Sequence, residues 1–361
     1  MMKTIPGPQE RPFLGSARTF AQDPPEELLR LAETYGEMVR FRLFTQTLYL
    51  VSSPELVREV LVTQAGSFPK WSRDVDLLSR FIGRGLVTSN GAYHQKQRQL
   101  VQPAFHTRRI AAYADTMVAY TAEMRAGWRD GETRDLSQEM VNLTMFIVGK
   151  TLFDADRAAL SGRAGRILEA SHALQAISDA DFKSPIDWPE WLPTARNRRR
   201  KAERAVLDRL ILGMIAERRA AAVDGRIHDT GDLLSMLLLA QDEAGAAMTD
   251  AQVRDELVTL FVAGHETTSN ALTWTWYLLA QHPDVEARLH AEVDGVLNGR
   301  LPTLNDLKAL PYTLMVLKEA MRLYPPAWVL NARQAAADVT LGDYHLPKGS
   351  VLFVSPYVMH R

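Results

Sequence analysis

The chain has 361 residues, of which 46% are hydrophobic and 24% charged, so it can bury a large core. A net charge of −1 gives no overall field that favours nucleic acid or an anionic membrane surface. The absence of cysteine excludes disulfides and thiolate metal sites from these residues. No leader-like apolar segment opens the chain and no stretch reaches the roughly 18 apolar residues of a membrane span, so we expect a cytoplasmic protein.

The first elements are marked by proline and glycine. Paired prolines at the start of residues 24–35 and Gly36 after them predict a helix over that range. Apolar residues alternate with arginines after Val39, and Thr45-Gln46 can reverse the chain, which predicts a β-hairpin over residues 39–51. Ser53 then caps an expected helix over residues 54–62.

Helical spacing dominates from there to about residue 325, and strand-like residues return only at 339–341 and 351–354. These late strands are expected to pair with the early hairpin. The fold class is therefore mainly α with a small mixed β lobe, and without repeats or linkers residues 1–361 form one domain. The basic run over residues 196–201 is interpreted as a solvated helix face, not a nucleic-acid contact.

One expected helix is long enough to cross the whole domain. Thr249 and Gln252 fit a capping box, and Pro283 marks the other limit, about 30 residues or roughly 45 Å later. Both halves are apolar, but the centre reads Ala-Gly-His-Glu-Thr-Thr from Ala263 to Thr268. Such small and polar residues are unexpected in the middle of a buried helix.

Residues three and four positions apart lie on the same face of a helix, so Ala263, Gly264, Thr267 and Thr268 share one small, flat stripe that a planar group could approach. An exposed polar patch on a partly exposed helix is the alternative. The zinc pattern HExxH is excluded because Ser269 stands where the second histidine is needed.

Other candidate residues are charged. Glu319 and Arg322 lie on one helix face as an ion pair. His94 and Arg98 share a face of an earlier helix, and Arg333 precedes the late strands. Cations from such distant positions can converge on the acidic groups of a ligand.

Taken in order, these residues resemble the cytochrome P-450 family along the whole chain. Pro6-Gly7-Pro8 resembles its proline-rich entry, and the central motif of the long helix resembles its oxygen-activation motif. Glu319 and Arg322 match its ExxR motif, and His94 with Arg98 matches WxxxR, with histidine in place of tryptophan. Arg333, followed by Asp338 and Gly342, resembles its propionate-binding strand segment.

The resemblance implies a haem-dependent monooxygenase that inserts one oxygen atom of O2 into a lipophilic substrate. Haem b would lie against the face from Ala263 to Thr268, with Ala263 and Gly264 keeping the oxygen pocket open. His94, Arg98 and Arg333 would bind the propionates. Glu266, Thr267 and Thr268 would be catalytic, with Thr267 holding oxygen or water by a hydrogen bond and Glu266 relaying protons.

The resemblance also implies partners. Electrons would come ultimately from NAD(P)H through a separate ferredoxin or flavodoxin with its reductase, and Lys96 is a candidate docking cation. The expected pocket segments are residues 81–88, the loop around Trp188 and Trp191, and residues 329–330. All are rather apolar, which indicates a fatty acid or a terpenoid as substrate.

One departure from the family is clear. The family's iron is held by a cysteine thiolate, and this chain has no cysteine; the metal ligand is therefore absent from it. We expect the sequence to be incomplete at its C-terminus, lacking the cysteine loop and a final helix, and to be inactive as written with apolar surface exposed. The alternative is a non-catalytic helical protein of the same fold that binds haem or a lipophilic molecule.

Overall fold

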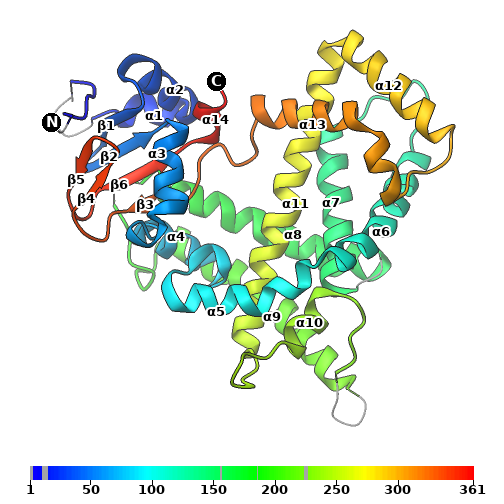
Figure 1. Ribbon diagram of the computed structural model, residues 1–361. Helices are drawn as coiled ribbons and strands as arrows, with labels where there is room; N and C mark the ends of the chain where they lie inside the picture. Colours follow the sequence, from blue (N-terminus) through cyan, green and yellow to red (C-terminus); the bar gives the residue numbers. More distant parts are fainter. Residues whose placement is uncertain (1–2, 10–14, 155–156, 185, 223–226) are drawn as a thin grey trace.

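The computed structural model describes residues 3–9, 15–154, 157–184, 186–222 and 227–361. A helical body stands beside a small sheet lobe, and α11 (Asp250–Gln281) runs through the middle of the body (Figure 1). The expected mainly α fold with a small β lobe is confirmed. Within the described ranges, no helix combines the length and apolar character that crossing a lipid bilayer requires.

The sheet lobe joins the two ends of the chain. Its larger sheet has the order β1-β2-β6-β3. These strands are β1 (Met38–Leu43), β2 (Gln46–Val51), β6 (Val351–Val354) and β3 (Arg333–Gln334). The predicted hairpin is confirmed, although its turn is Phe44-Thr45, one residue earlier than expected, with Phe44 at φ 54°. The parallel pairing of β6 with β2 confirms the expected contact between a late strand and the hairpin.

The other late strand was assigned wrongly. β4 (Val339–Leu341) pairs with β5 (Tyr344–Leu346) in a separate two-stranded sheet. The reason is local, because Gly342 at φ 53° allows a two-residue turn that returns the chain directly onto β4.

The helices begin and end close to the sequence signals. α2 is Pro24–Tyr35, as predicted, with Gly36 at φ 96° ending it. α3 (Pro54–Arg58) continues as one π-helical turn, Glu59–Thr63, so the expected helix over 54–62 is present but not uniform. The remaining α-helices are α1 (Ala17–Gln22), α4 (Ser72–Ile82), α5 (Gly91–Val101), α6 (Thr107–Ala126), α7 (Leu136–Phe153), α8 (Arg157–Phe182), α9 (Ala195–Ala220), α10 (Leu233–Leu239), α12 (Pro283–Leu297), α13 (Pro311–Leu323) and α14 (Pro356–Met359).

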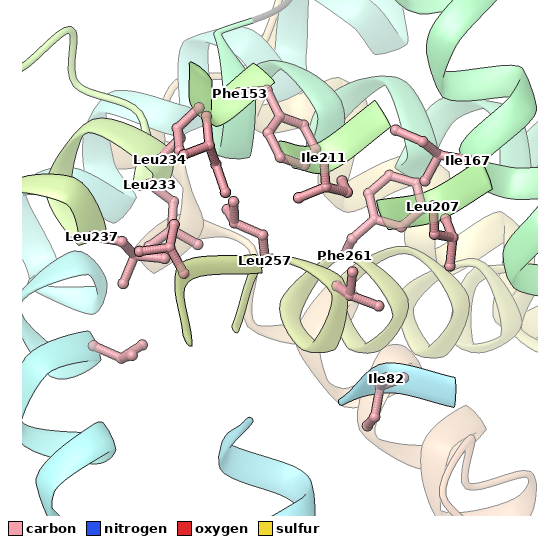
Figure 2. Packing of buried hydrophobic residues seen from close by; sticks show 14 of the residues in the cluster. Ile82, Phe153, Ile167, Leu207, Ile211, Leu233, Leu234, Leu237, Leu257 and Phe261 are labelled. Atoms are coloured by element: carbon pink, nitrogen blue, oxygen red, sulfur yellow. The ribbon is translucent and has the colours of Figure 1, made fainter. Parts of the chain in front are cut away.

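The largest core surrounds the first half of α11. Leu257 and Phe261 of α11 are almost fully buried, and Figure 2 shows them among side chains of α9, α10 and neighbouring helices. The capping box between Thr249 and Gln252 is formed as predicted. The basic run at the start of α9 is not wholly solvated, since Arg200 is buried in an ion pair with Asp181.

Some apolar side chains stay at the surface. On α13, Leu314, Met315 and Met321 are 48%, 60% and 41% exposed. Tyr277 near the end of α11 is 48% exposed. This side of the body is therefore more apolar than a typical protein surface.

Candidate active site

The centre of α11 has two different faces. Ala263, Thr267 and Thr268 are exposed, whereas His265 and Ser269 are almost fully buried on the opposite side. The exposed positions are small or hydroxyl-bearing and lie about one helical turn apart. The helix therefore presents a low, polar face beside an apolar core.

Gly264 does not share this face in the way the spacing predicted. It is half-buried, and a Cβ added to it would lie 3.2 Å from Cγ2 of Val148 on α7. The glycine therefore permits close packing of α11 on α7. On α7, the Thr144 hydroxyl donates a hydrogen bond to the His265 carbonyl at 3.0 Å and joins the two helices at the same level.

Glu266 and Thr267, the acid and the alcohol of the motif, form hydrogen bonds with different partners. The Gln175 side chain on α8 donates a hydrogen bond of 2.6 Å to Oε1 of Glu266. The Thr267 hydroxyl donates to the Ala263 carbonyl at 2.6 Å. Because the hydroxyl proton is used in this bond to the residue one turn back, the lone pairs of Thr267 Oγ1 can accept a hydrogen bond from a donor on the exposed face.

His265 is the buried member of the motif. Its Nδ1–H donates to the Phe261 carbonyl at 2.7 Å, and its Nε2 has no partner among the described residues. Burial lowers the pKa of this imidazole, so the neutral ring is favoured. No cluster of three or more His, Cys, Asp or Glu side chains suited to a metal ion exists in the described part of the chain.

A second wall of the site is cationic. Backbone hydrogen bonds run from Trp71 N–H to the Ala332 carbonyl at 2.7 Å and from Gln334 N–H to the Pro69 carbonyl at 2.9 Å. This isolated antiparallel bridge places Lys70 directly opposite Arg333. Side chains opposite each other in such a pair lie on the same face, about 5 Å apart at Cβ. Two positive charges are therefore held side by side.

His94 and Arg98 of α5 belong to the same wall. His94 Nδ1 lies 3.3 Å from Ser89 Oγ. Burial, together with the charges of Lys70, Arg98 and Arg333, lowers the pKa of His94. The sequence predicted that His94, Arg98 and Arg333 converge. The charges of Arg98 and Arg333 both lower the pKa of His94, which is consistent with this prediction. Lys70 was missed, because nothing near it in the chain marks it as special.

The charges of this wall are poorly compensated. Burial and the neighbouring Arg333 lower the pKa of Lys70 to about 8, and burial lowers the pKa of Arg333. Arg333 Nε is buried without a hydrogen-bond partner among the described residues. None of Lys70, His94, Arg98 and Arg333 forms an ion pair with a carboxylate in the described ranges. The wall has the charge pattern of a site for an anionic group.

Other predicted residues have clear structural partners. Arg322 forms a two-point ion pair with Glu319 at 2.7 and 2.8 Å and donates to the His360 carbonyl at 2.6 Å, so it ties α13 to the segment after β6. Lys96 is paired with Asp242 at 2.6 Å, so its charge is already compensated.

The expected pocket segments do not all face inward. Phe81 is buried, and Leu86 and Val87 pack against the main core. Trp188 and Trp191 are 47% and 80% exposed, because the loop between α8 and α9 lies on the surface. Those two tryptophans therefore do not line a pocket in this structure.

The site fits a flat group that carries acidic substituents. The exposed stripe of α11 offers a flat contact surface, and the uncompensated cations offer partners for carboxylates. Haem has this shape and charge, with its propionates suited to Arg98, His94, Lys70 and Arg333. The axial thiolate is not among these 361 residues, because they contain no cysteine.

Known proteins resemble this chain along most of its length. A family model described as cytochrome P-450 matches residues 5–361. The chain is 40% identical to cyclooctatin synthase of Streptomyces melanosporofaciens over 354 residues, which cover 97% of this chain and 74% of that protein. It is 38% identical to cyclooctat-9-en-7-ol 5-monooxygenase of the same organism over 369 residues (99% and 75%). It is 32% identical to pentalenene oxygenase of Streptomyces avermitilis over 352 residues (97% and 76%).

The chain is thus of the class that combines a helical body with a haem site beside one long helix. It belongs to the cytochrome P-450 family, and it spans about three quarters of the length of these relatives. The family is one of oxidoreductases, monooxygenases that bind haem b and oxidise lipophilic substrates with electrons drawn from NAD(P)H through a partner protein.

Proposed function

We propose that the substrate is a terpenoid. Of the two classes that the sequence left open, fatty acid and terpenoid, the second is supported by the names of the relatives, which refer to cyclooctat-9-en-7-ol and to pentalenene. Phe81, Leu86 and Val87 of the expected pocket segment are apolar and lie in or against the main core that includes the first half of α11. We further propose that residues 1–361 act as one domain in the cytoplasm and that a separate ferredoxin or flavodoxin delivers the electrons.

The oxygen chemistry rests on a separate observation, the adjacent acid and alcohol, Glu266 and Thr267, at the centre of α11. When bound, haem supplies reductive activation of O2 and transfer of one oxygen atom to a C–H bond. Thr267 Oγ1, on the exposed face, accepts a hydrogen bond from a water or from a protonated oxygen there. Its neighbour Thr268, also exposed, offers a second hydroxyl.

Proton supply is assigned to Glu266. Its carboxylate lies one residue before Thr267 and accepts a hydrogen bond from the Gln175 side chain. Rotation of the Glu266 side chain out of that hydrogen bond moves a proton from solvent toward Thr267 Oγ1. Arg98 and Arg333, with the His94 ring as a further hydrogen-bond donor, would hold the propionates of a bound haem.

The function is tested with protein expressed from the complete gene, including any sequence that follows Arg361. Pentalenene, cyclooctat-9-en-7-ol and palmitic acid are each incubated with this holoenzyme, NADPH and a surrogate ferredoxin and reductase. We expect products 16 mass units heavier from the ring compounds and none from palmitic acid. Oxidation of palmitic acid alone would overturn the terpenoid assignment.

The role of Thr267 is tested by Thr267→Ala with Thr273→Ala as the matched control. Both hydroxyls donate to the carbonyl one turn back, at 2.6 and 2.8 Å, but Thr273 is outside the motif. We expect Thr267→Ala to lower product formed per NADPH about tenfold or more and Thr273→Ala to leave it unchanged. Equal effects of both variants would contradict the assignment.

A reduced carbon-monoxide difference spectrum separates enzyme from binding protein. It is recorded on the 361-residue chain loaded with haem and on the product of the complete gene. A thiolate-type band in the second protein supports the monooxygenase. Haem binding without such a band in either protein would favour a non-catalytic binding role.

A further inference from the structure

The loop of residues 83–89 is fastened to α11 by two adjacent carboxylates. Asp255 Oδ2 accepts a hydrogen bond from Arg84 N–H at 2.7 Å, and Glu256 Oε2 accepts one from Leu86 N–H at 3.1 Å. Glu256 is only 1% exposed. Hydrogen bonds to an ionised carboxylate are stronger than neutral ones, so these two residues attach the loop most strongly when both are charged.

Two glycines let the loop approach α11 this closely. A Cβ at Gly83, which has φ 79°, would come within 2.0 Å of Asp255 Oδ1. A Cβ at Gly85 would come within 2.4 Å of Thr259 Oγ1. No larger residue fits at either position unless the loop or the α11 side chains move.

The loop is also held from the side of the cationic wall. Lys70 Nζ donates to the Leu86 carbonyl at 2.6 Å and to the Ser89 carbonyl at 3.1 Å. The Thr88 hydroxyl closes the loop by donating to the Gly83 carbonyl at 2.6 Å. The loop therefore spans the distance between α11 and the cationic wall, which are the two walls of the candidate site.

Glu256 also lies in line with the oxygen-activation motif. It precedes Ala263 by seven residues, which is close to two helical turns, so both project from nearly the same side of α11. The loop fastened to Glu256 thus forms an end wall, about 10 Å along the helix from the exposed face.

We infer that Asp255 and Glu256 are positioning residues that hold the 83–89 loop as the end wall of the substrate site. The part of this inference that concerns substrate rests on the proposed function, whereas the attachment of the loop does not. Neither residue touches the reacting atoms. Their role is to fix the distance between the loop and the α11 face, and so the space available to the substrate.

The attachment has a built-in pH dependence. Burial raises the pKa of Glu256 to about 7, with Asp255 adding to the rise, while the Leu86 hydrogen bond and Lys70 oppose it. The charged groups that face Glu256 are Asp255 on its own helix and Lys70 across the loop; its Oε1 has no partner among the described residues. Protonation below pH 7 weakens the acceptor for Leu86 N–H, so the loop opens more readily in acid.

The first test is hydrogen exchange of the peptide covering residues 83–89 in the 361-residue chain at pH 7.5. Glu256→Ala is compared with Glu256→Gln, whose amide oxygen can still accept, and with Asp250→Asn as control. Asp250 is an exposed carboxylate on α11 that pairs with Arg219 and does not contact the loop. Peptides of α7 report whether the body stays folded.

We expect exchange in the 83–89 peptide to rise about tenfold in Glu256→Ala, less in Glu256→Gln, and not in Asp250→Asn. The α7 peptides are expected to keep their protection. Unchanged exchange in Glu256→Ala would overturn the inference, as would an equal rise throughout α7.

The second test measures KM and kcat of the holoenzyme from the complete gene with pentalenene. A positioning role predicts a KM raised about tenfold in Glu256→Ala with kcat changed less than twofold. Faster loop exchange with an unchanged KM would overturn the positioning role. If the wild type oxidises no terpenoid, the proposed function fails, while the exchange experiment still decides whether the attachment exists.

Discussion

A substitution at Asp74 of α4 tests how the segment that carries Arg333 is held in place. The Asp74 carboxylate accepts the Ala332 N–H at 2.9 Å, one residue before Arg333. Burial raises the pKa of Asp74 from 3.8 to about 6, although the Ala332 hydrogen bond and Arg73 oppose the rise. An acid with a raised folded-state pKa opposes folding when it is charged. The shift corresponds to about 3 kcal/mol above pH 6, at about 1.4 kcal/mol per pKa unit.

We therefore expect Asp74→Asn to raise the free energy of unfolding at pH 7.5 by about 1–3 kcal/mol. The amide oxygen still accepts from Ala332 N–H, but no charge is buried. The size of the advantage depends on pH: it is complete above the folded pKa of about 6, declines as the pH falls through 6, and is lost below the unfolded value of 3.8, where the wild-type carboxyl is protonated in both states.

The measurement is urea unfolding of the 361-residue chain, followed by circular dichroism at pH 7.5 and 4.5. Asp76→Asn is the control, because Asp76 is exposed on the same helix. The reasoning is refuted if Asp74→Asn is no more stable than Asp76→Asn at pH 7.5. It is refuted equally if the advantage at pH 4.5 is as large as at pH 7.5.

Three further predictions concern α11 and its neighbours. Gly264→Val should lower the free energy of unfolding by about 1–3 kcal/mol. Adding Val148→Ala to the same chain should restore much of this loss, and urea unfolding of the single and double variants measures this non-additivity. Phe261→Ala should lower it by about 3–5 kcal/mol; a loss below about 1 kcal/mol would contradict the burial of this ring. Gln175→Leu should free the Glu266 carboxylate and change the amount of product that the holoenzyme forms per NADPH, and an unchanged amount would contradict the role of this hydrogen bond.

The boundaries of the main elements could be predicted because their signals are local. Pro24 and Gly36 fix the ends of α2, and Thr249 with Gln252 fixes the start of α11. The pairing of Val339–Leu341 could not be predicted in the same way, since alternation shows a strand but not its partner. The partner was decided by the tight turn at Gly342.

The site was predicted in its motif residues but not in its supports. Glu266 and Thr267 stand out because polar residues interrupt an apolar helix. Gln175 lies 91 positions before Glu266, and nothing in its own helix marks it as a partner. The close approach of Gly264 to Val148 could not be predicted either, because spacing along α11 carries no information about α7.

The positions of Lys70 and Arg333, opposite each other in a strand pair, indicate an anionic ligand. Like charges directly opposite each other in a strand pair destabilise it, yet the Trp71 and Gln334 backbone hydrogen bonds hold this pair in register. Asp74 secures the same segment by a bond to Ala332 rather than by neutralising either cation. A local conflict that the surrounding structure maintains is expected at functional sites. An anionic group bound between Lys70 and Arg333 would remove the repulsion, so ligand binding and stability of the chain are coupled there.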